Sequence, residues 1–454
     1  MVAAFSVGTC MLMYPIARRL GATTAGAALA VALETFNVMH NVEGRLVLLN
    51  SQLLFWSSAT LYGGLRWMAR ANELKRERKS FGFRERLAWA IGVGVLGGNA
   101  FSVKHTGLAS PGLVGVEAAL GAFSLLEQPM YMLDLVVYIV SMALTYSLWF
   151  AFHFWCMIYS HGTLKQEEEF MTPQYQSLLI GSATYDKDAK WSEGFWWTMW
   201  TFNKRMVAHS AATTQPHDWG SRPLDWIFNL RGVSYWGSCV LMRLCVFAGR
   251  GDRVNCLTPK PPPPLPLLIN SLRFSSVSTM GTAPDKSAIY LFGNPLEVWG
   301  IIAVIGLLSL FYVFGQRTAH YKTVSSDRVV YKTGSDRVMP LVTFYQEHWQ
   351  SATPPLMFVF MGWLLNLLPY MAIHRTTFAY HYMPALVYGN LLLALFVDKV
   401  SSALVDPRGS FQWLGPALAA VAAGSVWLYY SPWIYAIPLE LDQHAKMRWL
   451  ERWN

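Results

Sequence analysis

Residues 133–158 read LDLVVYIVSMALTYSLWFAFHFWCMI, and this apolar run decides the class of fold. Asp134 is its only charged side chain. A helix needs roughly 20 mostly apolar residues to cross a bilayer, and this run is longer. Because runs of similar character recur along the chain, the sequence predicts an all-α polytopic membrane protein.

The composition agrees with this class. Of 454 residues, 53% are hydrophobic and 14% are charged, whereas soluble domains carry about 25% charged residues. The net charge of +9 does not indicate a nucleic-acid partner, because Lys and Arg fall largely between the apolar runs, where they set topology. The five cysteines lack metal-ligand spacing, so no metal site is expected. The sequence shows no cleavable signal peptide, and an apolar run begins at Met1.

About ten apolar runs are predicted to be membrane spans, namely 1–17, 22–40, 46–68, 87–103, 106–126, 133–158, 296–315, 354–373, 382–398 and 411–430. The strongest positive run lies between Arg70 and Arg86 and is predicted to be cytosolic. A second basic loop, Arg317 to Arg337, gives the same orientation when the spans alternate. This orientation makes residues 159–295 a long luminal segment between two groups of helices, 1–158 and 296–454.

The luminal segment is not uniform along its length. Residues 191–209 are rich in Trp and Phe and predict an amphipathic helix at the membrane interface. Residues 238–286 hold Cys239, Cys245, Cys256 and a proline run, and they show no clear period. We interpret them as a disordered or foreign insertion whose deletion leaves folding intact.

The stretch 217–226, HDWGSRPLDW, is the most polar and turn-forming part of this segment. Pro216, Gly220 and Pro223 prevent a helix from running through it. Such a loop beside apolar spans suits a ligand that is half polar and half lipid. The alternative, favoured on spacing alone, is a loop anchored at the headgroup level by its Trp residues.

The predicted topology collects polar residues at the luminal ends of the spans. They are Arg45, Lys104, His105, His217, Asp218, Arg222, His374, Arg375 and His381. Each alone is more simply a snorkelling anchor, but together the cations predict a site for a lipid phosphate. A lipid-linked phosphosugar fits, because its tail lies in the bilayer and its sugar in the lumen. Cations beside the phosphate stabilise the charge that develops as the sugar leaves, and a carboxylate is needed to deprotonate the acceptor.

Six ordered segments resemble motifs of the protein O-mannosyltransferases. They are Gly44–Ser51 (GRLVLLNS), Ser102–Leu108 (SVKHTGL), Phe170–Gln176 (FMTPQYQ), the stretch 217–226, Ile289–Pro295 (IYLFGNP), and Gly362–Trp363 with Pro369 and His381–Leu386 (HYMPAL). The resemblance implies a GT-C-type glycosyltransferase of the endoplasmic reticulum membrane that transfers mannose from dolichyl phosphate mannose to Ser and Thr of secretory proteins. It implies no cofactor, and a dimer with itself or with a paralogue.

The resemblance also implies roles for particular residues. Arg45 and Lys104 would contact the donor headgroup. The remaining implied site residues are His217, Ser221 and Arg222 in the luminal wall, with Asn294, His381 and Tyr382 in support. The family's acidic pair falls upstream of Met1, so no catalytic residue is assigned. Asn50 stands where the family usually has Asp, and Tyr185 to Trp191 leave no room for its β-trefoil repeats.

Other functions remain open at this point. A membrane subunit that binds the donor or a partner transferase without turnover is the first alternative, and the missing acidic loop is the feature that favours it. A glycosyltransferase that uses another polyprenyl-phosphate sugar is close to the main hypothesis. A transporter is disfavoured, because no span shows the broken and repeated pattern typical of that class.

Overall fold

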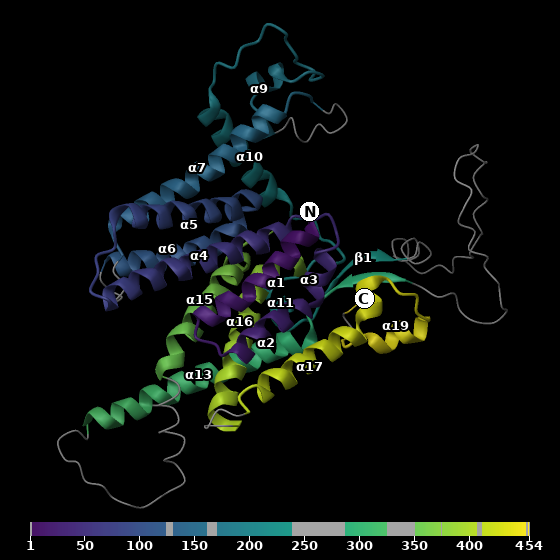
Figure 1. Cartoon of the computed structure of the whole chain (residues 1–454). Coiled ribbons are helices and arrows are strands. Elements are labelled where there is room, and N and C mark those ends of the chain that lie inside the picture. The colour runs from purple at the N-terminus through teal and green to yellow at the C-terminus, as the bar shows by residue number, and fades with distance from the viewer. Residues whose placement is uncertain are drawn as a thin grey trace, which may run out of the picture.

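The computed structural model of the chain describes residues 2–123, 130–160, 170–237, 287–324, 350–373, 375–405, 411–450 and 453. Over these residues the chain is a mostly helical bundle (Figure 1). The first group of helices is α1 (Val2–Arg19), α2 (Thr24–Thr35), α3 (Val38–Glu43), α4 (Asn50–Arg76), α5 (Phe83–Val103), α6 (Ala109–Ala122) and α7 (Met132–Cys156). The middle segment adds α9 (Pro173–Leu178), α10 (Phe195–Ala212) and α11 (Pro223–Ile227). The last group is α13 (Pro295–Val324), α15 (Gln350–Met371), α16 (Met383–Val400), α17 (Leu414–Tyr429), α18 (Ser431–Tyr435) and α19 (Leu441–Met447).

The centre of the bundle is α16, whose residues from Met383 to Leu395 are all buried. It packs against α2, α13 and α15. A helix that is apolar on every side must be covered on every side, and α16 is therefore an inner helix. Its sequence carries Asn390, which is accommodated by a polar partner discussed below.

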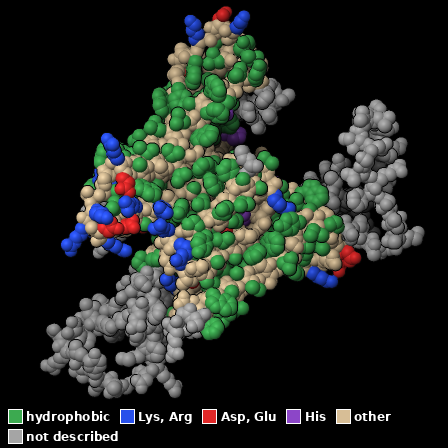
Figure 2. Space-filling view, in the orientation of Figure 1, with side chains coloured by type: hydrophobic (Ala, Val, Ile, Leu, Met, Phe, Trp, Pro, Cys, Tyr) green, Lys and Arg blue, Asp and Glu red, His purple; other side chains and the backbone are tan. Residues whose placement is uncertain are grey.

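The outer helix α7 shows the opposite distribution. It packs against α5, yet much of its apolar surface faces outward, including Val136, Leu144, Leu148 and Trp155. Figure 2 shows apolar side chains over most of the visible face, with charged side chains gathered at the turn between α4 and α5. This pattern is the one expected for helices whose surroundings are lipid.

The helix ends on the side of this charged turn are joined by hydrogen bonds. The Asp398 carboxylate of α16 accepts hydrogen bonds from the backbone N–H of Thr23, at 2.8 Å, and from its hydroxyl. Gly26 makes room for this carboxylate, because a Cβ there would lie 2.3 Å from Asp398 Cγ. Lys399 Nζ donates to the carbonyl of Gly21 at 3.1 Å, so the start of α2 is fixed to the end of α16.

Several predictions can be compared with these elements. Each of the ten predicted runs contains a helix, but in the described residues only four helices are individually long and apolar enough to span a membrane. They are α5, α7, Pro354–Met371 of α15, and Ala379–Ala403, which includes α16. Three shorter apolar helices lie over Thr24–Thr35, Pro295–Leu310 and Leu414–Tyr429. The number of spans and the division into three segments therefore stay predictions.

The all-α prediction misses one small sheet. Strand β1 (Val233–Gly237) pairs antiparallel with β2 (Ala288–Leu291), and Val233 lies opposite Leu291. These strands adjoin the predicted insertion 238–286, so its immediate flanks are structured. The insertion itself, His374, and residues 325–337 of the second basic loop lie outside the described residues.

Candidate functional site

Lys104 projects from a break between two helices. α5 ends at Val103, Lys104 is extended with φ −162° and ψ 140°, and a 3-10 turn, η1 (His105–Leu108), follows. Its Nζ lies 5.5 Å from the centre of the Tyr380 ring, which belongs to a second 3-10 turn, η3 (Ala379–Tyr382). The break removes Lys104 from the helix and brings it to the loop before α16.

Glu43 lies opposite, at the end of α3. The N-cap Asn37 accepts a hydrogen bond from His40 N–H and starts this short helix, and Glu43 is its last residue. Glu43 is completely buried. Both carboxylate oxygens accept hydrogen bonds, Oε1 from the Tyr235 hydroxyl of β1 and Oε2 from the Asn50 amide at 3.1 Å. Two donors on two oxygens suit the ionised form of a carboxyl group.

The opposite charges of Glu43 and Lys104 act on each other. Burial lowers the pKa of Lys104 to about 8, while the Glu43 carboxylate opposes this change and the Arg375 guanidinium adds to it. Burial raises the pKa of the Glu43 carboxyl, against the hydrogen bonds from Tyr235 and Asn50 and the charge of Lys104. The site therefore contains one anion between donors and two neighbouring cations.

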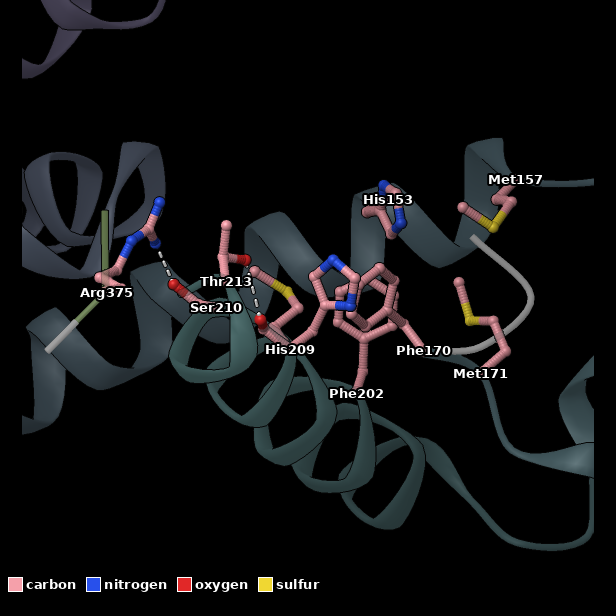
Figure 3. Close-up of a pocket in the computed structure, with 10 residues that line it drawn as sticks. His153, Met157, Phe170, Met171, Phe202, His209, Ser210, Thr213 and Arg375 are labelled. Atoms are coloured by element: carbon pink, nitrogen blue, oxygen red, sulfur yellow. Dashed lines mark hydrogen bonds between the residues drawn. The ribbon is translucent and has the colours of Figure 1, made fainter. Parts of the chain in front are cut away.

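Arg375 connects these charges to a cavity of about 420 Å³ between α7 and α10. Figure 3 shows Arg375 at one end, where its Nη1 donates to the Ser210 hydroxyl, and Met157 and Met171 toward the other end. The cavity is lined by His153, Met157, Phe170, Met171, Phe202, Met206, His209, Ser210, Thr213 and Arg375. A cavity with apolar walls and a cation at one end can hold a molecule with an apolar chain and an anionic head.

Some predicted site residues form the scaffold behind Lys104 and Arg375. Ser221 is buried, and its hydroxyl accepts a hydrogen bond from Trp226 Nε1 at 2.8 Å. The Trp226 ring stacks on His381 with ring centres 6.1 Å apart, and His217 meets the Phe378 ring edge-on at 5.2 Å. These contacts bring the polar stretch 217–226 against the loop that carries Arg375.

Other predicted residues hold helices together rather than facing the cavity. Tyr382 is buried, and its hydroxyl accepts a hydrogen bond from Trp363 at 3.1 Å. The buried Asn294 amide donates to the carbonyls of Phe36 and Ala423, at 3.3 and 3.2 Å. Arg222 is exposed, and its backbone N–H donates to Asp225 at 2.8 Å at the start of α11.

Arg45 points away from Lys104. Its Nη2 donates to the carbonyl of Ile434, and its guanidinium lies 4.4 Å from the centre of the Tyr435 ring, both in α18. Gly44, just before it, allows the chain to pass close to α1, because a Cβ there would lie 2.5 Å from Ser6 Oγ. The sequence predicted a lipid phosphate as the partner of Arg45, whereas the structure gives this side chain partners within the protein.

Sequence reasoning overlooked Glu43 and Tyr235. Glu43 directly precedes the quoted Gly44–Ser51 segment, and an acidic residue at the end of a predicted span was a usable signal. No pattern in the sequence joins Tyr235 to Glu43, since 192 positions separate them. In the described part of the chain, no group of three or more His, Cys, Asp or Glu residues could hold a metal ion.

Comparison with known proteins gives consistent matches. Residues 1–158 match the family described as dolichyl-phosphate-mannose-protein mannosyltransferase, and residues 195–453 match the C-terminal four TMM region of protein-O-mannosyltransferase. Dolichyl-phosphate-mannose–protein mannosyltransferase 5 of Candida albicans is 22% identical over 57% of this chain and 28% of its own length. Mannosyltransferase 1 of Saccharomyces cerevisiae is 23% identical over 56% of this chain and 23% of its own length.

A solved structure has the same fold. It is that of the S. cerevisiae protein O-mannosyltransferase Pmt1-Pmt2 complex bound to the sugar donor, with a TM-score of 0.67 at 14% identity. The comparison covers all of this chain and 80% of the other. The stretches matched in the two curated relatives span only about a quarter of their lengths. On the two family matches, this multi-pass membrane protein belongs to the dolichyl-phosphate-mannose–protein mannosyltransferase family.

Proposed function

We propose that the protein binds dolichyl phosphate mannose and transfers its mannose to Ser and Thr hydroxyls of secretory-pathway proteins at the endoplasmic reticulum membrane. The cavity between α7 and α10 is the observation that carries the proposal. Its walls include Met157, Met171 and Phe202, which suit an isoprenoid chain, and Arg375 at its end suits a phosphate.

The proposed reaction breaks the bond between mannose C1 and the phosphate oxygen. The acceptor hydroxyl attacks C1 and loses its proton, and dolichyl phosphate leaves with the bonding electron pair. Lys104 and Arg375 would stabilise the negative charge that grows on the leaving phosphate. The base that takes the acceptor proton is not assigned to a residue of this chain.

The other predicted contacts keep supporting roles in this proposal. His217, Ser221, His381 and Tyr382 hold the loop that carries Arg375, and Asn294 fixes the base of α13. Arg45 and Arg222 lie at the rim, where they would meet lipid headgroups. By extension from the two-chain complex of similar fold, we propose that the chain pairs with a paralogue or with a second copy of itself.

A second candidate function is a subunit that binds the donor without turnover. Asn50 favours it, because an amide stands at the end of α4 where the resemblance places a carboxylate. This candidate shares the cavity and the cations with the first. The two differ only in whether mannose reaches an acceptor.

The test measures donor binding and transfer separately on the purified full chain. Radiolabelled dolichyl phosphate mannose gives the binding, and a Ser/Thr-rich peptide gives the transfer. Arg375→Ala should weaken binding by tens- to thousands-fold, since losing a charged contact costs roughly 2–5 kcal/mol. Met206→Trp should weaken it by filling the cavity, whereas the control Arg70→Ala, in the charged turn between α4 and α5, should bind normally.

The outcomes separate the candidates. Binding with transfer supports the enzyme, and binding without transfer supports the donor-binding subunit. If Arg375→Ala and Met206→Trp bind the donor as tightly as the wild-type chain, the cavity is not the donor site and the proposal is wrong.

A further inference from the structure

The completely buried Glu43 is not used by the proposed reaction. It touches no cavity-lining residue in the contacts described above, and its two oxygens are both taken by Tyr235 and Asn50. A buried carboxylate with hydrogen bonds to neutral donors still requires a counter-charge. Lys104 is the cation whose charge acts on it.

We propose that Glu43 is a positioning residue that keeps Lys104 protonated, so that Lys104 meets an anionic ligand as a cation. The identity of that ligand as a lipid phosphate rests on the proposed function. The pairing of Glu43 with Lys104 does not, because it follows from the arrangement of α3, α4, β1 and the break after α5.

The surroundings of Lys104 explain why a counter-ion is needed. Arg375 and His381 face it from the loop before α16, together with the Tyr380 ring. Arg375 repels a protonated Lys104, and partial burial favours the neutral amine. Glu43 is the charge that opposes both effects, and Tyr235 and Asn50 hold it in place.

The pair also suggests a variant that moves the carboxylate. Asn50 Nδ2 donates to Glu43 Oε2 at 3.1 Å, so the two side chains occupy adjoining positions. Exchanging them, as Glu43→Gln with Asn50→Asp, keeps one carboxylate and one amide in contact. The charge stays in the same buried space, displaced by about one hydrogen-bond length.

The test reads the protonation of Lys104 directly in the full chain without ligand. Trace acetylation by acetic anhydride across pH 6–10, followed by mass spectrometry, measures the fraction of neutral amine at Lys104. The wild-type midpoint is expected near pH 8, the pKa of Lys104 in its buried position. In Glu43→Gln it should fall by about one pH unit or more, as expected on losing an opposite charge.

Two further variants separate a charge effect from a structural one. Glu43→Gln/Asn50→Asp should restore a midpoint near the wild-type value, and Tyr235→Phe, which keeps the carboxylate, should not lower it. An unchanged midpoint in Glu43→Gln, or the same fall in both Glu43 variants, would overturn the proposal.

A donor-binding measurement on the same variants then separates this inference from the proposed function. A lowered Lys104 midpoint with no binding of dolichyl phosphate mannose by the wild-type chain would retain the ion pair and reject the ligand. Donor binding that depends on Arg375, with an unchanged midpoint, would retain the ligand and reject the role of Glu43.

Discussion

Lys104 and Arg375 differ in one property that matters for a phosphate site. A guanidinium stays charged at every accessible pH, whereas the partly buried amine of Lys104 has a pKa of about 8. Donor binding by the wild-type chain should therefore fall as the pH rises through 8, by up to about tenfold per pH unit. Lys104→Arg removes the titrating group and should flatten the profile between pH 7 and 9.

The same pKa has the opposite effect on stability. The folded-state pKa of Lys104 lies below its usual value near 10.5, so the unfolded chain binds more protons between these two values. The contribution of Lys104 to the free energy of unfolding should therefore increase from pH 8 to pH 10. Thermal unfolding of the wild type and Lys104→Met without ligand measures this contribution, and a difference between them that does not change with pH would contradict it.

Arg45 allows the lipid contact predicted from the sequence to be tested against the contacts in the structure. Its guanidinium donates to the carbonyl of Ile434 and lies over Tyr435, so Arg45→Ala should loosen α18. We expect the free energy of unfolding to fall by about 1–3 kcal/mol, the range of a charged hydrogen bond and a cation–π contact. Arg45→Lys should recover part of it.

Donor affinity decides between the two interpretations of Arg45. If α18 is its only partner, Arg45→Ala should change donor affinity far less than Arg375→Ala does. A large loss of affinity in Arg45→Ala at unchanged thermal stability would instead support a direct contact with the donor phosphate.

At the scale of elements, a buried polar group joins α2, α3 and α16. His40 Nδ1 lies 2.8 Å from Glu34 Oε1, and the Asn390 amide donates to Glu34 Oε2 at 3.0 Å. All three side chains are at least nine-tenths buried. Removing one partner of such an ion pair leaves the other charge without compensation, so His40→Ala should cost about 3–5 kcal/mol.

An exposed ion pair in the same protein is the matched control. Arg70 Nε lies 2.8 Å from Glu85 Oε1, and both side chains are more than one-third exposed. Arg70→Ala should cost no more than about 1 kcal/mol. Thermal unfolding in one detergent compares the two variants, and equal shifts in the unfolding temperature would show that the pair in the core contributes no more than the pair on the surface.

The sequence predicted the helices well and their partners poorly. Long apolar runs such as 133–158 specify a helix by themselves, and α7 occupies Met132–Cys156 within about one residue of that range. Spacing cannot show that Tyr235 reaches Glu43 or that Arg45 faces α18, because those contacts depend on how helices pack. The cations near the cavity were predictable as luminal charges, whereas the cavity itself depends on the position of α10 against α7.

The whole molecule has two distinct ends, and their assignment to the two sides of the membrane is still a prediction. Thr23, Asp398 and the charged turn between α4 and α5 are predicted to face the cytosol, because Lys and Arg concentrate there. Lys104 and the polar stretch 217–226 are predicted to face the lumen, where a lipid-linked sugar would be used.

Single acceptor sites for N-glycosylation test this orientation, because the sequence contains no Asn-X-Ser or Asn-X-Thr with X other than Pro. Arg78→Asn creates one with Ser80 in the turn between α4 and α5, and Lys190→Asn creates one with Ser192 before α10. Both positions are exposed, and the φ of 54° at Arg78 is one that Asn tolerates. In cells, Lys190→Asn should gain an endoglycosidase-sensitive glycan and Arg78→Asn should gain none, since only luminal sites meet the transferase. A glycan on Arg78→Asn and none on Lys190→Asn would place Lys104, Arg375 and the cavity on the cytosolic side and contradict the proposed luminal transfer.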